Sequence, residues 1–306
     1  RDVLGSRGLG DVYKRQMQYA GKILTPVLGI SQLNMKFKKA KISLDRILGL
    51  LETNSDVVYQ IGINKEGISS GKIEFKNVSF GYVPDHFILR HIDLSIEPGK
   101  VTALVGGSGA GKTSIVNLLY RMWDVHNGKI AIDGINIIDY DIKYLRENIS
   151  IVSQDIVLLN DTIYNNIVLG DSQIVLDDVV KATKIANIYD TIMNLDKQFE
   201  TIIGDRGVKL SGGQKQRLAI AMALVRKSRI IVFDEATSAL DNINDLAIYK
   251  KIVELFKDRT ILVIAHRLST IEEADKIYVL DSGRIIESGV HKTLMKKQGF
   301  YYQLYK

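Results

Sequence analysis

The sequence predicts an α/β fold with a mainly parallel central sheet and a separate antiparallel β subdomain. From about residue 71 onward, short apolar runs alternate with longer segments of helical periodicity. Interleaved strands and helices of this kind are typical of parallel sheets that helices cover. Polar and apolar residues instead alternate over 72–76, which indicates a half-buried strand of a different sheet.

The central strands are predicted where apolar runs end near polar or glycine-rich segments. They are Val101–Val105, Ile149–Ser153, Ile230–Asp234 and Thr260–Ala265. Helical periodicity predicts helices over Leu176–Leu195 and Asn242–Phe256. Further β structure is expected near 71–82, 128–138 and 276–288, the last with a hairpin turn at Asp281-Ser282-Gly283.

Composition excludes several classes of protein and of functional site. The chain has 306 residues, of which 46% are hydrophobic and 25% charged, which excludes a wholly disordered protein. Cysteine is absent, so disulfide scaffolds, thiolate zinc sites and cysteine nucleophiles are excluded. The net charge of +6 is compatible with phosphate ligands, an anionic membrane surface or nucleic acid.

The first seventy residues are expected to lie outside the main domain. Residues 1–16 lack periodicity, and two interpretations stay open: a translated sequencing-adapter sequence and a flexible native tail. Apolar residues recur at helical spacing over 31–51, and 17–51 carries six Lys or Arg against one acid. That excess favours the cytoplasmic side of a membrane span over a solvated helix face. No complete span is evident, and residues 52–70 are predicted to be a linker.

A glycine-rich motif predicts a phosphate-binding loop between a strand and a helix. It reads Gly106-Gly107-Ser108-Gly109-Ala110-Gly111-Lys112-Thr113, followed by Ser114 at the start of a helical segment. Backbone amides of such a loop and the helix start attract phosphate oxygens. Lys112 is expected to reach the β- and γ-phosphates, and the Thr113 hydroxyl to ligate Mg²⁺.

Two carboxylates follow an apolar strand at Asp234 and Glu235. Ligands of open parallel sheets bind at the carboxyl ends of strands. Asp234 is therefore expected to hold Mg²⁺, and Glu235 to orient and deprotonate an attacking water.

A second anion-binding helix start is predicted at Leu210-Ser211-Gly212-Gly213-Gln214, with Ser211 as the N-cap. One nucleotide loop and a second phosphate-seeking helix end indicate a ligand shared between two copies of the chain.

Together these motifs resemble the nucleotide-binding domain of an ATP-binding cassette transporter over residues 71–306. The run Leu210–Gln214 upstream of the acidic strand is the most specific part of this resemblance. The resemblance implies a P-loop NTPase core, a helical signature subdomain, and ATP with Mg²⁺ as ligands. The nucleotide-binding set would comprise Tyr82, Gly106, Gly107, Ser108, Gly109, Ala110, Gly111, Lys112, Thr113, Ser114, Gln154, Ser211, Gly212, Gly213, Gln214, Asp234 and Asp241.

The resemblance also implies individual roles. Tyr82 would stack on adenine, Gln154 would sense Mg²⁺ and couple to the membrane domain, and Asp241 would bridge two subunits. His266 would contact the γ-phosphate. The catalytic residues would thus be Glu235, His266, Lys112 and Gln154, and the metal ligands Thr113, Gln154 and Asp234.

Segment 201–207 resembles the exporter-specific stretch that touches transmembrane helices, with Asp205 in place of the usual Glu. Met222 replaces an Arg common in the helix after the signature. Residues 17–51 resemble the end of the last transmembrane helix and its extension in a fused half-transporter, so the chain is expected to be a C-terminal fragment.

The expected function is ATP hydrolysis that drives export of a peptide, lipid or drug, in a homodimer at the cell membrane with the cassette on the cytoplasmic side. Two alternatives are an importer ATPase subunit and a soluble cassette ATPase acting on nucleic acid or ribosomes. Only 98 positions separate Lys112 from Leu210, with no sustained heptads, and one cassette is present, which disfavours the second alternative. No nucleic-acid partner is therefore expected. A degenerate, non-enzymatic cassette is disfavoured because Lys112, Asp234, Glu235 and His266 are all present.

Overall fold

The computed structural model describes residues 3–52, 64–83, 85–153, 155–234, 253–264 and 271–306. The chain divides into two compact units, Arg1–Asp56 and Val57–Lys306. The dividing point lies inside the predicted linker.

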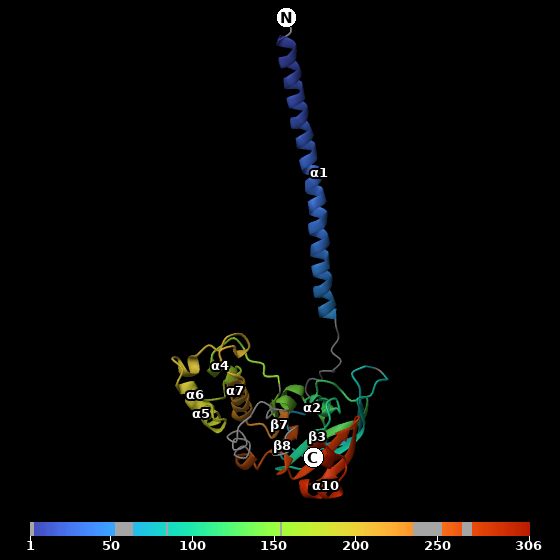
Figure 1. Cartoon of the computed structure of the whole chain (residues 1–306), viewed down its shortest axis with the longest axis vertical. Coiled ribbons are helices and arrows are strands. Elements are labelled where there is room, and N and C mark those ends of the chain that lie inside the picture. The colour runs from blue at the N-terminus through green and yellow to red at the C-terminus, as the bar shows by residue number, and fades with distance from the viewer. Residues whose placement is uncertain (1–2, 53–63, 84, 154, 235–252, 265–270) are drawn as a thin grey trace. The chain divides into compact units, whose positions relative to one another are not determined.

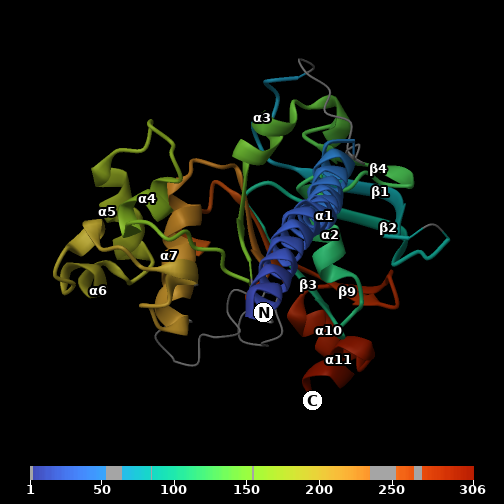
Figure 2. The same cartoon turned by 90° about the horizontal axis from the view of Figure 1, so that it is seen from above.

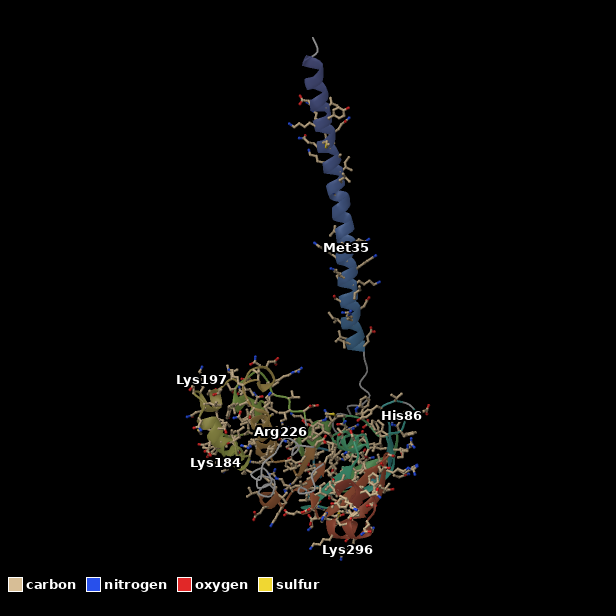
Figure 3. All side chains as sticks on the ribbon, viewed as in Figure 1. Met35, His86, Lys184, Lys197, Arg226 and Lys296 are labelled. Carbon is tan, nitrogen blue, oxygen red and sulfur yellow. The ribbon has the colours of Figure 1, made fainter. Side chains whose placement is uncertain are left out.

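The first unit is built on one helix, α1 (Val3–Glu52), drawn in blue in Figure 1. Its described side chains are exposed and project outward along its length (Figure 3). α1 begins at Val3 and so includes most of residues 1–16, for which the sequence shows no helical periodicity. Helical hydrogen bonds form within a segment and do not require an apolar stripe, so missing periodicity does not prevent a helix. Among the described residues, no helix combines the length and apolarity needed to cross a bilayer.

The larger sheet of the second unit carries the phosphate loop. In the described part of the chain it has the strand order β10-β9-β3-β8-β7-β6 and is parallel except for β10. The strands are β3 (Val101–Gly106), β6 (Ile149–Val152), β7 (Ile230–Asp234), β8 (Thr260–Ile264), β9 (Lys276–Asp281) and β10 (Arg284–Gly289). The predicted parallel sheet is confirmed, and the hairpin formed by β9 and β10 belongs to it.

The smaller sheet is antiparallel, with the order β2-β1-β4-β5 within the described residues. Its strands are β1 (Ile73–Phe80), β2 (Leu89–Ile96), β4 (Asn127–Ile132) and β5 (Ile135–Asn136). This sheet is the predicted antiparallel β subdomain.

Helices α4 to α7 gather on one side of this unit, away from the strands of the smaller sheet (Figure 2). The helices of the second unit are α2 (Lys112–Leu119), α3 (Ile142–Glu147), α4 (Ile163–Val168), α5 (Leu176–Ile185), α6 (Tyr189–Met193), α7 (Gly212–Val225), α10 (His291–Lys297) and α11 (Phe300–Tyr305). Short 3-10 turns occur at Ile137–Asp139, Gln198–Glu200 and Asp205–Gly207.

Strand β3 lies between two hydrophobic cores. Ala103 and Val105 join the core that also contains residues of α4 to α7, whereas Leu104 joins the core formed with α2 and the smaller sheet. Successive side chains of a strand point to opposite faces, so a fully buried strand must be apolar on both. All six residues of β3 are buried, which fixes the loop that follows it.

The predicted helix over 176–195 is interrupted in the structure. α5 ends at Ile185 and α6 begins at Tyr189, with Asn187 between them at a φ of 54°. Asparagine tolerates this left-handed conformation better than most residues, which explains the break. Most of the predicted helix Asn242–Phe256 lies outside the described residues.

Candidate nucleotide-binding site

The carboxyl ends of four parallel strands lie at one edge of the larger sheet. Register pairs Leu104 of β3 with Ile264 of β8, Ile264 with Asp234 of β7, and Phe233 with Val152 of β6. The phosphate loop and the carboxylate of Asp234 therefore emerge at the same edge, where such sheets bind ligands. Asp234 is 9% exposed.

The phosphate loop is shaped by its last glycine. Gly111 is the N-cap of α2 and has φ 104° and ψ 9°, a left-handed conformation that suits glycine. A Cβ at this position would lie 2.6 Å from Leu89 Cδ2, so a larger residue would strain the backbone and displace the buried Leu89 side chain. The crest of the loop, Ser108 and Gly109, is exposed.

Lys112 lies folded over this loop. Its Nζ donates hydrogen bonds to the carbonyl oxygens of Gly106 and Gly107, each at 2.9 Å, and the residue is only 5% exposed. A buried ammonium requires hydrogen-bonded acceptors, which these carbonyls supply. A phosphate oxygen arriving at the loop is a stronger, charged acceptor for the same group. Next to it in the first turn of α2, Thr113 is exposed and Ser114 is buried.

Tyr82 follows β1 and lies beside α2. Its hydroxyl is 3.2 Å from Ser114 Oγ, and Asn117 Nδ2 donates to it at 3.1 Å. Its ring is nearly perpendicular to those of Phe80 and Trp123, at centroid distances of 4.9 and 5.5 Å. The residue remains 40% exposed, which leaves surface for a ligand.

Ser211 caps α7 as the sequence predicts. Its hydroxyl accepts from the amide of Gln214 at 3.3 Å, and the Gln214 side chain accepts from the amide of Ser211 at 2.8 Å. This reciprocal pair is a capping box, which fixes the direction in which the helix begins. Space is open around Gly212 and Gly213, where an added Cβ would meet nothing within 4 Å.

The structure brings together the loop, Tyr82, Thr113, Ser114 and Asp234 around α2 and the sheet edge. It describes Ser211, Gly212, Gly213 and Gln214 at the start of α7. The remaining predicted site residues, Gln154, Glu235, Asp241 and His266, lie outside the described residues. Gln154, Glu235 and His266 follow β6, β7 and β8 closely in sequence.

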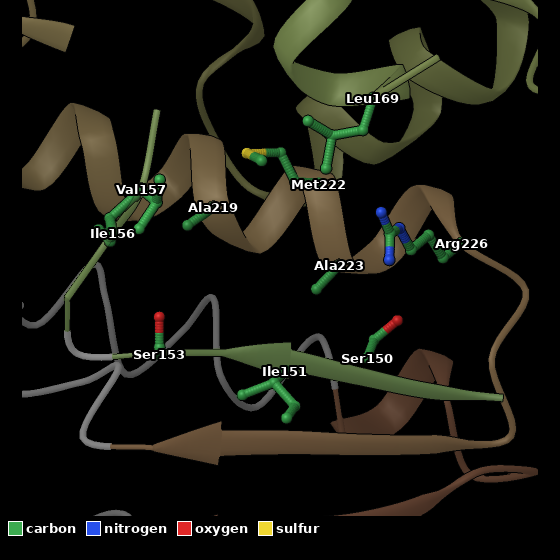
Figure 4. A pocket seen from close by; sticks show the side chains of 10 residues that line it. All are labelled: Ser150, Ile151, Ser153, Ile156, Val157, Leu169, Ala219, Met222, Ala223 and Arg226. Atoms are coloured by element: carbon green, nitrogen blue, oxygen red, sulfur yellow. The ribbon is translucent and has the colours of Figure 1, made fainter. Parts of the chain in front are cut away.

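A cavity of about 180 Å³ lies between β6 and α7, next to Ser153 (Figure 4). Figure 4 shows Met222 and Leu169 near one another and Val157 at the other end of the same opening. Val157 is 78% exposed and Leu169 42% exposed, although both are apolar. The full lining is Ser150, Ile151, Ser153, Ile156, Val157, Leu169, Ala219, Met222, Ala223 and Arg226.

A protein-family model described as ABC transporter matches residues 89–238, which include the phosphate loop, the capped start of α7 and Asp234. An ATP-dependent lipid A-core flippase of Haemophilus influenzae is 44% identical over 285 residues, covering 92% of this chain and 48% of the relative. Residues 89–238 belong to the ABC transporter family.

A further relative and a solved structure agree with this assignment. A Staphylococcus aureus ATP-binding/permease protein named for multidrug export is 46% identical over 260 residues, covering 85% of this chain and 45% of the relative. A solved structure, that of a bacterial Atm1-family ABC exporter with ATP bound, matches with a TM-score of 0.82 at 40% identity, covering 88% of this chain and 47% of that one. The chain spans about half the length of the relatives that it matches.

Sequence reasoning missed Asn117 and Trp123 as neighbours of Tyr82. Asn117 lies three residues after Ser114 on α2, and side chains at that spacing share a helix face. This spacing could have identified Asn117, whereas the contact with Trp123 depends on how the smaller sheet packs.

Proposed function

We propose that this chain is the ATP-hydrolysing cassette of an exporter, with residues 71–306 as the nucleotide-binding domain. The observation that most supports this proposal is the position of the phosphate loop. The buried strand β3 leads into this loop and Lys112 at the sheet edge where β7 ends with Asp234. The proposed boundaries leave 17–51 as the end of the last transmembrane helix and its cytoplasmic extension, 52–70 as a linker and 1–16 as a non-native or disordered tail.

The triphosphate would bind over the loop crest and the start of α2. There Lys112 would exchange the carbonyls of Gly106 and Gly107 for the β- and γ-phosphates. Tyr82 would stack on the adenine. The amides of the loop and the N-terminal end of α2 attract the phosphate charge, which is the usual logic of such sites.

Mg²⁺ fits the donors that the structure offers. Thr113 contributes an exposed hydroxyl at the helix start and Asp234 a carboxylate at the sheet edge, and hard oxygen donors of this kind suit Mg²⁺. Gln154 would complete the set. When bound, the ion neutralises charge on the phosphates.

Glu235 would orient and deprotonate the attacking water, and His266 would contact the γ-phosphate. Phosphoryl transfer depends mainly on positioning and charge stabilisation. One well-placed general base at this edge is therefore sufficient to activate the attacking water.

The start of α7 would complete the site of a second copy. Ser211 and Gly213 lie at an open helix start, which suits capping of a phosphate held by the partner's loop. Asp241 would bridge the two subunits. A ligand that binds the closed dimer more tightly than the open one shifts the balance toward closure.

Closure would be transmitted to membrane helices near Gln154 and segment 201–207. Val157, Leu169, Ile202 and Val208 are exposed although apolar, and apolar side chains gathered on a surface are typical of a docking site, which supports this role. Asp205 belongs to this segment. The transported molecule would be a peptide, lipid or drug, and the cassette would lie on the cytoplasmic side of a cell membrane.

Two variants test this function. Glu235→Gln should bind ATP normally and lose hydrolysis, whereas the matched control Glu254→Gln, an exposed glutamate, should keep both. Ser211→Arg should abolish hydrolysis and leave ATP binding intact. Wild-type turnover in Glu235→Gln would overturn the base assignment, and wild-type turnover in Ser211→Arg would overturn the shared site.

A further inference from the structure

Tyr82 is presented by a tight loop between β1 and β2. The amide of Ile88 donates to the carbonyl of Phe80 at 2.8 Å, and the amide of His86 donates to the carbonyl of Val83 at 3.2 Å. Gly81 makes the loop possible, because a Cβ there would lie 2.0 Å from the carbonyl oxygen of His86. The backbone on which Tyr82 stands is therefore fixed at both ends of the loop.

The hydroxyl of Tyr82 is fixed separately, by α2. Asn117 Nδ2 donates to this oxygen at 3.1 Å, which leaves the hydroxyl hydrogen free to be donated to Ser114 Oγ at 3.2 Å. One accepted and one donated bond satisfy a phenol well. Since Ser114 and Asn117 are three residues apart on α2, their side chains address the hydroxyl from one helix face.

We propose that Asn117 is a positioning residue for the nucleoside end of the ligand, acting through the hydroxyl of Tyr82. The inference rests on the proposed nucleotide-binding function and deepens it. Asn117 is half-buried and stands one turn beyond the phosphate-facing start of α2, so its contribution is to the ring rather than to the phosphates.

This arrangement makes α2 the common support of both ends of the site. Its first residue, Lys112, belongs to the phosphate loop, and its Asn117 holds the aromatic ring. The separation between the ring and the phosphate loop is then set by a helix, which is a stiff element with a fixed rise per residue. Pre-ordering the ring reduces the conformational entropy lost when a base stacks on it.

The proposal predicts a loss that depends on the base. Asn117→Ala should weaken MgATP binding by about threefold to tenfold, the range expected for one net hydrogen bond, and leave inorganic tripolyphosphate binding unchanged. Tyr82→Phe keeps the ring but removes the hydroxyl and both of its hydrogen bonds, so it should produce a selective loss at least as large. The double variant should be no weaker than Tyr82→Phe alone, because that variant already removes the bond from Asn117.

Trp123 supplies the readout in the full 306-residue chain. It is the only tryptophan in the sequence, and its ring lies 5.5 Å from that of Tyr82. The protein can be titrated with MgATP while the fluorescence of Trp123 is followed. The affinity for tripolyphosphate can be measured by its competition with MgATP. Asn165→Ala is the matched control, because Asn165 is also a helical asparagine whose amide donates a hydrogen bond, to Asp161 at 2.9 Å. It should bind both ligands as the wild type does.

Each outcome decides the question. Equal weakening of MgATP and tripolyphosphate in Asn117→Ala would overturn the proposal, as would unchanged MgATP binding or additive losses in the double variant. Lys112→Ala should weaken both ligands and separates the phosphate end from the base end. A wild-type chain that bound neither ligand would overturn the proposed function itself, whereas normal wild-type binding with an unselective Asn117→Ala would overturn only the role of Asn117.

Discussion

At the scale of single residues, the site depends on positions with strict backbone or hydrogen-bonding requirements. Gly111 combines a left-handed backbone with a close approach to Leu89, and Lys112 directly after it is buried on loop carbonyls. A substitution at Gly111 therefore changes the loop shape and the position of the ammonium at once.

We expect Gly111→Ala to lose most nucleotide binding and to lower the free energy of unfolding by more than the ~1 kcal/mol typical of a left-handed alanine. Gly134→Ala is the matched control, since Gly134 has a φ of 84° but open space around it. Titration with MgATP and thermal unfolding would measure both effects. Equal losses of unfolding free energy in the two variants would show that the contact with Leu89 is unimportant for stability.

Asp133 provides a pH prediction. Burial raises the pKa of its carboxyl, but hydrogen bonds from the Ser70 side chain and from the amides of Gly71, Lys72 and Ser69 outweigh burial and lower the pKa below its ordinary value. A carboxyl with a lowered folded-state pKa stabilises the fold above the unfolded value of about 3.9 and loses that contribution as the pH falls through the folded pKa.

Asp133→Asn should therefore lower the free energy of unfolding near pH 7, and this free energy should fall less steeply than in the wild type as the pH drops below about 3.9. The control Asp196→Asn changes an exposed carboxylate and should follow the wild type. Melting temperatures across this range decide the matter, and parallel curves for wild type and Asp133→Asn would contradict the role given to these hydrogen bonds.

At the scale of elements, the start of α7 combines stability with function. Ser211→Ala should cost about 1 kcal/mol of unfolding free energy through the lost cap and also reduce ATP turnover. Thr162 caps α4 in the same way, accepting from the amide of Asn165 at 3.0 Å. Thr162→Ala should therefore cost similar stability and leave turnover unchanged, as thermal melts and phosphate release can show. A parallel fall in turnover would reduce the role of Ser211 to helix capping.

Helices and strands could be predicted from the sequence where the local pattern of apolar residues matches the burial found in the structure. β3 is apolar apart from Thr102 and ends at a glycine, and β7 is apolar up to Asp234. The cap of α7 is predicted by Ser211 and Gln214, three residues apart. The break near Asn187 was not predictable from apolar spacing, because helical periodicity continues through it. The cavity between β6 and α7, and the bonding of Asn117 to Tyr82, arise from tertiary packing between segments distant in sequence, which periodicity does not encode.

At the scale of the whole molecule, the shared site predicts complementation between inactive chains. In a symmetric dimer each site takes its loop from one copy and its α7 start from the other. Lys112→Ala and Ser211→Arg should each be inactive alone. Mixed in equal amounts they should recover up to about a quarter of wild-type turnover, because half of the dimers are mixed and each has one intact site. Phosphate release at rising protein concentration would measure this, and no recovery would contradict the shared site.

The two sheets of the second unit are joined by hydrogen bonds. The Tyr278 hydroxyl bonds both the amide and the carbonyl of Ser95, at 2.9 and 3.0 Å, and the amide of Arg90 donates to the carbonyl of Gly283 at 2.8 Å. These hydrogen bonds connect β2 of the smaller sheet to β9 and to the turn between β9 and β10 in the larger sheet. These bonds therefore hold the distance between the Tyr82 ring and the phosphate loop constant. A hinge that responds to nucleotide binding is expected instead where α4 to α7 meet the larger sheet.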